Sequence, residues 1–198
     1  MIDQDIVIIG GGIAGAAVAS HLSERASVRL LEMESQPGYH STGRSAAIFA
    51  EPYGNEHVRA LTRASRSFLF SPPRGFSEHG LVRPRMILLV ARQGQESALQ
   101  RFLDEARPQD GLIEATTHEA LRLHPLLRAE GLRRAAYTEQ SADIEVHELH
   151  FGYLRLFQSR SPFTIHIMGN HPFNTLSRKH ASVSSFERPI TSLSPLSR

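Results

Sequence analysis

The first residues of the chain alternate between apolar runs and a helical pattern. Residues 6–9 are Ile-Val-Ile-Ile, a β-branched run that is typical of a strand buried on both faces of a parallel sheet. After a glycine-rich turn, residues 13–25 carry small and apolar side chains that favour a helix, and residues 28–32 have the pattern of a second strand. This order predicts a β-α-β unit and places the chain in the α/β class.

Helical and strand patterns continue downstream. Residues 55–70 place apolar side chains at helical spacing, with Asn55 as the N-cap and a Pro-Pro pair after the run. The last helix is expected to start near Asp143 and to carry its apolar stripe to Phe157. The elements expected between these two helices are a strand over residues 86–91 and helices over residues 95–106 and 117–124.

Composition narrows the class of protein. The chain has 198 residues, of which 40% are hydrophobic and 21% charged, so it can form a globular core. It contains no cysteine, which excludes a disulfide framework, a thiolate metal site and a cysteine nucleophile. It has no apolar run long enough to span a membrane, and its first residues are acidic where a secretory signal would be basic. We therefore expect a soluble, cytoplasmic protein.

The composition changes after Phe157. Residues 158–198 are rich in serine and proline, contain the only lysine, Lys179, and lose the helical spacing. We expect residues 1–157 to form the compact part and residues 158–198 to be an aberrant, disordered tail, either a frame-shifted or foreign segment or a natural divergent end. The positive charges of this tail are scattered and lack interleaved aromatic residues, so nucleic-acid binding is not expected.

The most specific motif lies between the first strand and the first helix. Gly10, Gly12 and Gly15 fit the pattern G-x-G-x-x-G, and the acidic Glu32 ends the second strand. In this pattern the first glycine permits a tight turn, the second lets a diphosphate approach the backbone, and the third allows close packing of helix and strand. A carboxylate at the position of Glu32 can accept hydrogen bonds from a ribose. The motif predicts a bound dinucleotide, either NAD or FAD.

The segment after Glu32 favours FAD. Residues 38–47 are Gly-Tyr-His-Ser-Thr-Gly-Arg-Ser-Ala-Ala, and with the fingerprint and residues 142–155 they resemble FAD-dependent oxidoreductases of the D-amino-acid oxidase and glycine oxidase superfamily, particularly proteins like D-arginine dehydrogenase. The resemblance implies the N-terminal part of a two-domain flavoenzyme with a Rossmann-like FAD-binding domain. The cofactor-binding residues that the fingerprint and the resemblance indicate are Gly10, Gly12, Ile13, Ala14, Gly15, Glu32, Met33, Ser41, Thr42, Gly43, Arg44, Ser45, Ala46, Ala47 and Ile48.

The resemblance also implies an activity. Members of the superfamily transfer a hydride from the carbon next to the nitrogen of an amino acid or amine to the flavin. Tyr53 either lines the substrate pocket or packs in the core, and Ile48-Phe49-Ala50 makes a preference for cationic substrates doubtful. Because these enzymes are about twice as long, we expect a truncated copy that is inactive alone. The alternatives are a non-catalytic flavin-binding fragment, which could associate through its exposed surface, and an NAD-binding dehydrogenase domain.

Two histidines lie close together in the expected last helix. His147 and His150 are three residues apart, so one helical face can hold both. The segment does not match HExxH, and the resemblance implies no metal there. We expect surface or capping roles for these histidines and no metal site.

Overall fold

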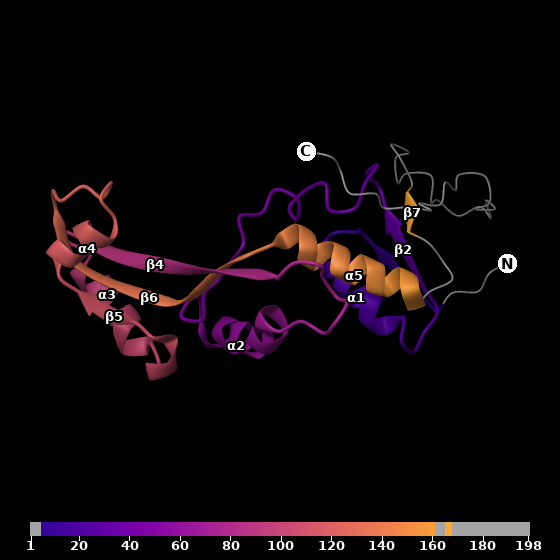
Figure 1. Cartoon of the computed structure of the whole chain (residues 1–198), viewed down its shortest axis with the longest axis horizontal. Coiled ribbons are helices and arrows are strands. Elements are labelled where there is room, and N and C mark those ends of the chain that lie inside the picture. The colour runs from indigo at the N-terminus through magenta and orange to yellow at the C-terminus, as the bar shows by residue number, and fades with distance from the viewer. Residues whose placement is uncertain (1–4, 161–164, 168–198) are drawn as a thin grey trace. The chain divides into compact units, whose positions relative to one another are not determined.

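Figure 1 shows the computed structural model of the chain, which describes residues 5–160 and 165–167. These residues form two compact units, each with its own sheet. Unit 1 contains residues 5–45, 73–79, 146–160 and 165–167, and unit 2 contains residues 46–72 and 80–145. The predicted cofactor residues up to Ser45 therefore belong to unit 1.

Unit 1 is built on a parallel sheet with the strand order β1-β2-β7. Its elements in chain order are β1 (Ile6–Ile9), α1 (Ile13–Leu22), β2 (Val28–Glu32), α5 (Val146–Arg160) and β7 (His166–Ile167). β1 and β2 pair in parallel from Ile6 opposite Val28 to Ile9 opposite Leu31, and α1 connects them. The predicted β-α-β unit is confirmed.

The core of unit 1 lies between α1, β2 and α5, and Figure 1 shows the two helices side by side. Ala16 and Ala19 are fully buried on α1, and their short side chains let this helix pack close to its neighbours. Leu154 and Phe157 are fully buried on α5 and anchor that helix, each contributing about 1.5–3 kcal/mol through burial. The buried members of this core are Ala16, Ala19, Val28, Leu30, Leu154, Phe157 and Ile165.

Unit 2 is built on an antiparallel sheet in which β6 pairs with three other strands. Its elements are β3 (Ile48–Phe49), α2 (Glu56–Phe70), β4 (Val82–Arg92), α3 (Glu96–Glu105), the 3-10 turn η1 (Pro108–Asp110), β5 (Ile113–Ala115), α4 (Thr117–Leu123) and β6 (Leu132–Ile144). β4 and β6 run beside each other as long strands, from Val82 opposite Ile144 to Arg92 opposite Leu132 (Figure 1). β3 and β5 pair with different parts of β6.

The helices of unit 2 start where polar side chains cap them. The Asn55 side chain accepts a hydrogen bond from the backbone N–H of Val58 at 3.0 Å, which confirms the predicted N-cap of α2. At α4, Thr116 and Glu119 form a reciprocal capping box. The predicted helices over 95–106 and 117–124 are thus present as α3 and α4 with slightly shorter bounds.

The middle of the chain contains one strand that was not predicted and one element whose expected start is wrong. The unpredicted strand is the long β6, whereas the strand expected over 86–91 is confirmed as part of the longer β4, Val82–Arg92. The last helix does not start near Asp143, because Asp143 pairs with Ile48 and Arg83 at the end of β6. It starts at Val146 and continues past Phe157 to Arg160.

Part of the expected tail is described. Residues 158–160 complete α5, and residues 166–167 form β7, which pairs with Leu31 and Glu32 of β2. Residues 161–164 and 168–198 lie outside the described residues, and so does most of the expected disordered tail. The domain boundary at 157/158 stays a prediction. In the part of the chain that is described, no helix combines the length and apolar character needed to cross a membrane.

Candidate functional site

The fingerprint forms a sharp turn between β1 and α1. Gly10 follows the last residue of β1 with φ of +98°, a conformation that favours glycine, and its N–H donates to the carbonyl of Leu31 at 2.7 Å. A β-carbon on Gly15 would overlap the carbonyl oxygen of Gly10, so only glycine lets α1 pack directly on the turn. These are the roles that the pattern predicts for the first and third glycines.

The N-terminus of α1 presents backbone N–H groups for which the described part of the chain provides no acceptor. Gly12 is the N-cap and provides no side-chain cap, and the N–H of Ile13 donates to Thr42 Oγ1 at 3.0 Å. The N–H groups of Gly12, Ala14 and Gly15 have no hydrogen-bond acceptor among residues 5–160 and 165–167. Together with the positive end of the helix dipole, such groups form an anion-binding site.

Glu32 lies at the C-terminal end of β2, beside this turn. Its side chain is buried, and its two oxygens accept hydrogen bonds from the N–H groups of Gly11 at 2.8 Å and Glu34 at 2.9 Å. Each carboxylate oxygen can accept a second hydrogen bond, so both keep capacity for a ligand hydroxyl. Met33 is exposed next to it.

Within the segment of residues 41–45, Thr42 is the residue that forms a hydrogen bond to the fingerprint, at Ile13. The hydroxyl of Thr42 accepts from Ile13 and retains its own proton for donation to a ligand. Gly43 allows a close approach within this segment, because a β-carbon there would lie 2.6 Å from the carbonyl oxygen of Gly38. The exposed Arg44 guanidinium lies over the Tyr39 ring at 5.3 Å from its centroid, and Ser41 and Ser45 are exposed.

The remaining predicted site residues lie in unit 2. Ala46 and Ala47 precede β3, Ile48 is exposed within it, and the carbonyl of Ala47 accepts from the N–H of Ile144. Their assignment to the cofactor stays a prediction. The Tyr53 side chain is 73% exposed and does not pack in the core of this unit, which contradicts the core alternative for that residue.

His150 is a site residue that sequence reasoning missed. The expected surface or capping role is wrong, because the side chain is buried and its Nε2 donates to the carbonyl oxygen of Gly11 at 2.7 Å. Burial lowers the pKa of the imidazole, and the hydrogen bond to Gly11 offsets part of this effect. Its spacing was the available signal, since residues 150, 154 and 157 share one helix face and the latter two are apolar.

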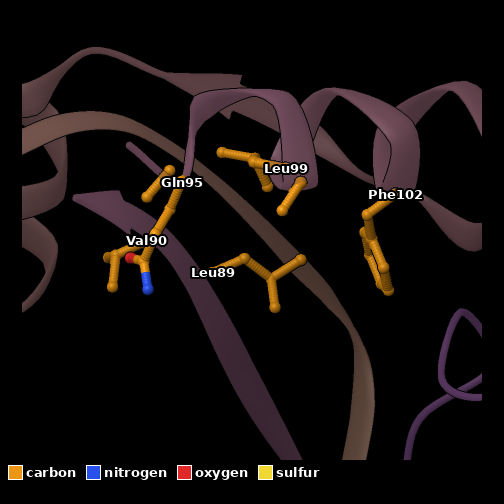
Figure 2. Close-up of a pocket in the computed structure, with 7 residues that line it drawn as sticks. Leu89, Val90, Gln95, Leu99 and Phe102 are labelled. Carbon is orange, nitrogen blue, oxygen red and sulfur yellow. The ribbon is translucent and has the colours of Figure 1, made fainter. Parts of the chain in front are cut away.

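Neither the pocket of unit 2 nor the described histidine and acidic side chains form a reactive centre. Unit 2 has an apolar pocket between β4 and α3, and its lining includes Leu89, Leu99 and Phe102 (Figure 2). No titratable side chain lines it, so it provides no acid, base or nucleophile. Among the residues that the structure describes, no group of three or more histidine and acidic side chains is arranged to hold a metal ion.

Comparison with known families identifies the fold and the motif. Residues 5–183 match the DAO family, described as FAD dependent oxidoreductase. The chain belongs to this family. The match continues past residue 155, the last residue of the resemblance, and past Phe157, the expected end of the compact part. Membership of the DAO family agrees with the fingerprint, the helix N-terminus and the carboxylate described above.

Individual relatives of the DAO-family chain are considerably longer. The tRNA 5-methylaminomethyl-2-thiouridine biosynthesis bifunctional protein MnmC of Marinobacter nauticus is 34% identical over 132 residues, which cover 64% of this chain and 21% of that protein. Glycine oxidase from Geobacillus kaustophilus is 20% identical with a TM-score of 0.67, over 82% of this chain and 46% of that chain. L-proline dehydrogenase from P. horikoshii is 21% identical with a TM-score of 0.64, over 85% and 47%.

These structural matches confirm the predicted α/β fold class. The chain spans about half the length of the two solved enzymes and about a fifth of the Marinobacter protein. The residues present also suit the cofactor of the DAO family. The N–H groups of α1 that no described residue accepts from suit a diphosphate, the absent side chain of Gly12 leaves room for it, and Glu32 has lone pairs for a ribose.

Proposed function

We propose that this chain carries the FAD-binding part of an oxidoreductase that acts on an amino acid or a related amine. The observation that carries the proposal is the N-terminus of α1, where Gly12, Ala14 and Gly15 offer N–H groups that no described residue accepts from. A diphosphate is the part of FAD that satisfies such groups. The family match names FAD as the cofactor, which favours it over NAD.

Different residues around the turn would bind different parts of this cofactor. The N–H groups of α1 would donate to the diphosphate oxygens, and the Thr42 hydroxyl would add a donor while still accepting from Ile13. Glu32 would accept from the ribose hydroxyls through the lone pairs that Gly11 and Glu34 leave free. Arg44 lies in the same segment and adds a positive charge that favours phosphate.

The substrate class is supported by the names of two of the solved relatives. Glycine oxidase and L-proline dehydrogenase are named for amino acids, whose nitrogen is bonded to the carbon next to the carboxylate. When bound, FAD supplies the chemistry by accepting a hydride from that carbon, and the imine that remains is hydrolysed. The protein then has to bind and orient the substrate.

For the 198-residue chain alone we propose flavin binding without detectable turnover. The 198 residues correspond to less than half of the length of the solved enzymes, and we infer that they do not form a complete substrate site by themselves. Loss of substrate orientation can remove about 7–11 kcal/mol of rate enhancement. The 198-residue protein, assayed with FAD, an artificial electron acceptor and a panel of D-amino acids, glycine and sarcosine, is expected to give no turnover. Acceptor reduction at ordinary enzyme rates would contradict this proposal.

The cofactor assignment is tested by flavin binding. The full chain is refolded with excess FAD, freed of unbound cofactor and examined for flavin absorbance, and its dissociation constant is measured by fluorescence quenching. Gly12→Leu is expected to abolish binding, because even its β-carbon would lie 3.2 Å from Thr42 Oγ1 and the rest of the side chain would fill the diphosphate position.

Gly80→Leu is the matched control. Gly80 is exposed in unit 2, and a β-carbon there would meet only one atom, the carbonyl oxygen of Val82, at 3.8 Å. This variant is expected to bind FAD like the wild type. Stoichiometric binding of NAD without affinity for FAD, or unchanged FAD affinity in Gly12→Leu, would overturn the assignment.

A further inference from the structure

The peptide groups of Gly11 are held on both sides by buried side chains from distant parts of the sequence. Its N–H donates to Glu32 Oε2 at 2.8 Å, and its carbonyl oxygen accepts from His150 Nε2 at 2.7 Å. The side chains are 9% and 3% exposed, so water does not compete strongly for either hydrogen bond. The orientation of Gly11 is therefore fixed by unit 1 itself, independently of any ligand.

The carbonyl of Gly11 also determines where the next N–H points. The Gly11–Gly12 peptide bond is trans, so the carbonyl of Gly11 and the N–H of Gly12 point in opposite directions. Since the carbonyl is directed at the imidazole of His150, the N–H of Gly12 is directed away from it. This N–H is one of those that have no acceptor within the described ranges 5–160 and 165–167.

The imidazole of His150 also lies against a second turn, at Gly38. Gly38 has φ of +78°, and a β-carbon there would lie 2.7 Å from Cε1 and 2.9 Å from Nδ1 of His150. The carbonyl of Gly38 accepts from the N–H of Gly43 at 2.7 Å, next to Thr42, whose hydroxyl accepts from the N–H of Ile13 in α1. The ring thus fills the space between the fingerprint and the turn that begins the segment of residues 41–45.

The geometry points to His150 as a positioning residue of the cofactor site, which fixes the direction of the Gly12 N–H toward a diphosphate. The inference rests on the proposed binding of FAD. Because a carbonyl oxygen can only accept a hydrogen bond, Nε2 of His150 carries the proton. The proposed role therefore requires a hydrogen-bond donor at the position of Nε2. His150 itself does not touch the diphosphate in this assignment.

Two amide variants that differ in length by one methylene group test whether a hydrogen-bond donor must reach the carbonyl of Gly11. Both side chains are polar, but only the longer one places its nitrogen at the position of Nε2. The amide nitrogen of Gln in His150→Gln can occupy the position of Nε2, whereas the shorter Asn in His150→Asn stops near Nδ1. His150→Asn is expected to weaken binding of FAD and of ADP by about 10- to 100-fold, and His150→Gln by less than about threefold. His147→Asn, on the exposed residue one turn earlier, is the matched control and is expected to leave both affinities unchanged.

The ratio of ADP affinity to adenosine affinity is the readout that a merely structural role would not change, because a loss of structure would weaken both ligands in parallel. Adenosine lacks the diphosphate, so its affinity is expected to stay the same in all three variants while that of ADP falls in His150→Asn. Parallel loss of adenosine and ADP binding, or unchanged ADP binding in a folded His150→Asn, would overturn the role of His150. A wild type that binds neither FAD nor ADP would overturn the proposed function as well.

If His150→Asn does not fold, amide hydrogen exchange of the wild type tests whether the Gly12 N–H faces the diphosphate. The Gly12 N–H is expected to gain protection when ADP is added and to gain none with adenosine. Binding of ADP without added protection at Gly12 would show that this N–H does not face the diphosphate and would overturn the inference.

Discussion

Gly15 lies so close to Gly10 that a β-carbon on the helix residue would overlap the carbonyl oxygen of the turn residue. The contact joins the first turn of α1 to the end of β1, at the point where the N-terminus of α1 presents its N–H groups. Glycine at position 15 is therefore required both for the packing of α1 on the turn and for the position of the anion-binding N–H groups. A substitution here is expected to affect both stability and ligand binding.

The first prediction concerns Gly15→Ala. The overlap forces α1 away from β1, and overpacking of this kind costs about 1–3 kcal/mol of the free energy of unfolding. FAD affinity is expected to fall with it. Urea unfolding followed by circular dichroism measures the cost. Gly80→Ala is the control, with an expected change of less than about 0.5 kcal/mol, since its β-carbon would make only an ordinary contact. Equal stability of the two variants would contradict the packing role.

A second prediction concerns Glu32→Gln. The amide group replaces one acceptor oxygen by a donor, which leaves the N–H of Gly11 or of Glu34 unpaired in a buried place. The expected cost is about 1–3 kcal/mol in the free energy of unfolding, together with weaker binding of adenosine and FAD. Glu34→Gln removes the same charge two residues away and is expected to change both quantities little. Adenosine binding that is equally strong in both variants would exclude a ribose contact at Glu32.

Much of unit 1 follows from local patterns in the sequence. The run Ile6–Ile9, the three glycines and Glu32 form one continuous β-α-β motif, whose strand pairing and hydrogen bond from Gly11 to Glu32 both lie within residues 6–32. The cap at Asn55 is likewise local, because its partner is Val58. Such features need no knowledge of distant parts of the structure.

β6 could not be predicted in the same way. Its buried residues include Ala135, Ala136 and Ala142, which have no strand preference of their own, and its polar residues do not alternate regularly with large apolar ones. The strand forms because β3, β4 and β5 all pair with it. His150 was missed for a related reason, since its acceptor, Gly11, lies 139 residues earlier in the sequence.

A third prediction concerns Arg66 in unit 2. Its guanidinium donates to Glu51 Oε1 at 2.6 Å and to the side chain of Gln140 at 3.2 Å, and it lies over the Phe70 ring at 4.5 Å. Glu51 is buried, so Arg66→Met leaves a buried carboxylate without this partner and is expected to cost about 2–3 kcal/mol.

Arg66→Lys distinguishes geometry from charge. A single ammonium group cannot reproduce the planar fork that reaches Glu51 and Gln140 while stacking on the ring, so we expect a loss of about 1–2 kcal/mol. The exposed Arg101→Lys is the control and is expected to stay within about 0.5 kcal/mol of the wild type. Full stability of Arg66→Lys in urea unfolding would mean that charge alone suffices.

The last prediction is a pH dependence of stability at His150. Burial lowers the pKa of this imidazole below its ordinary value of about 6.5, and the hydrogen bond to the Gly11 carbonyl and the charge of Glu32 offset only part of the shift. Below about pH 6.5 the unfolded chain therefore takes up a proton at this residue that the folded chain does not. The resulting stability is fully present above that pH and is lost as the pH falls toward the lowered pKa.

The measurement is urea unfolding of the wild type and of His150→Gln over a series of pH values from neutral to mildly acidic. The glutamine variant retains a donor for Gly11 and cannot titrate, so its free energy of unfolding is expected to decline less than that of the wild type over this range. His147→Gln removes an exposed histidine of the same helix and is expected to retain most of the wild-type decline. An identical decline in wild type and His150→Gln would mean that the buried imidazole takes up its proton equally well in the folded chain, and that its environment does not favour the neutral ring.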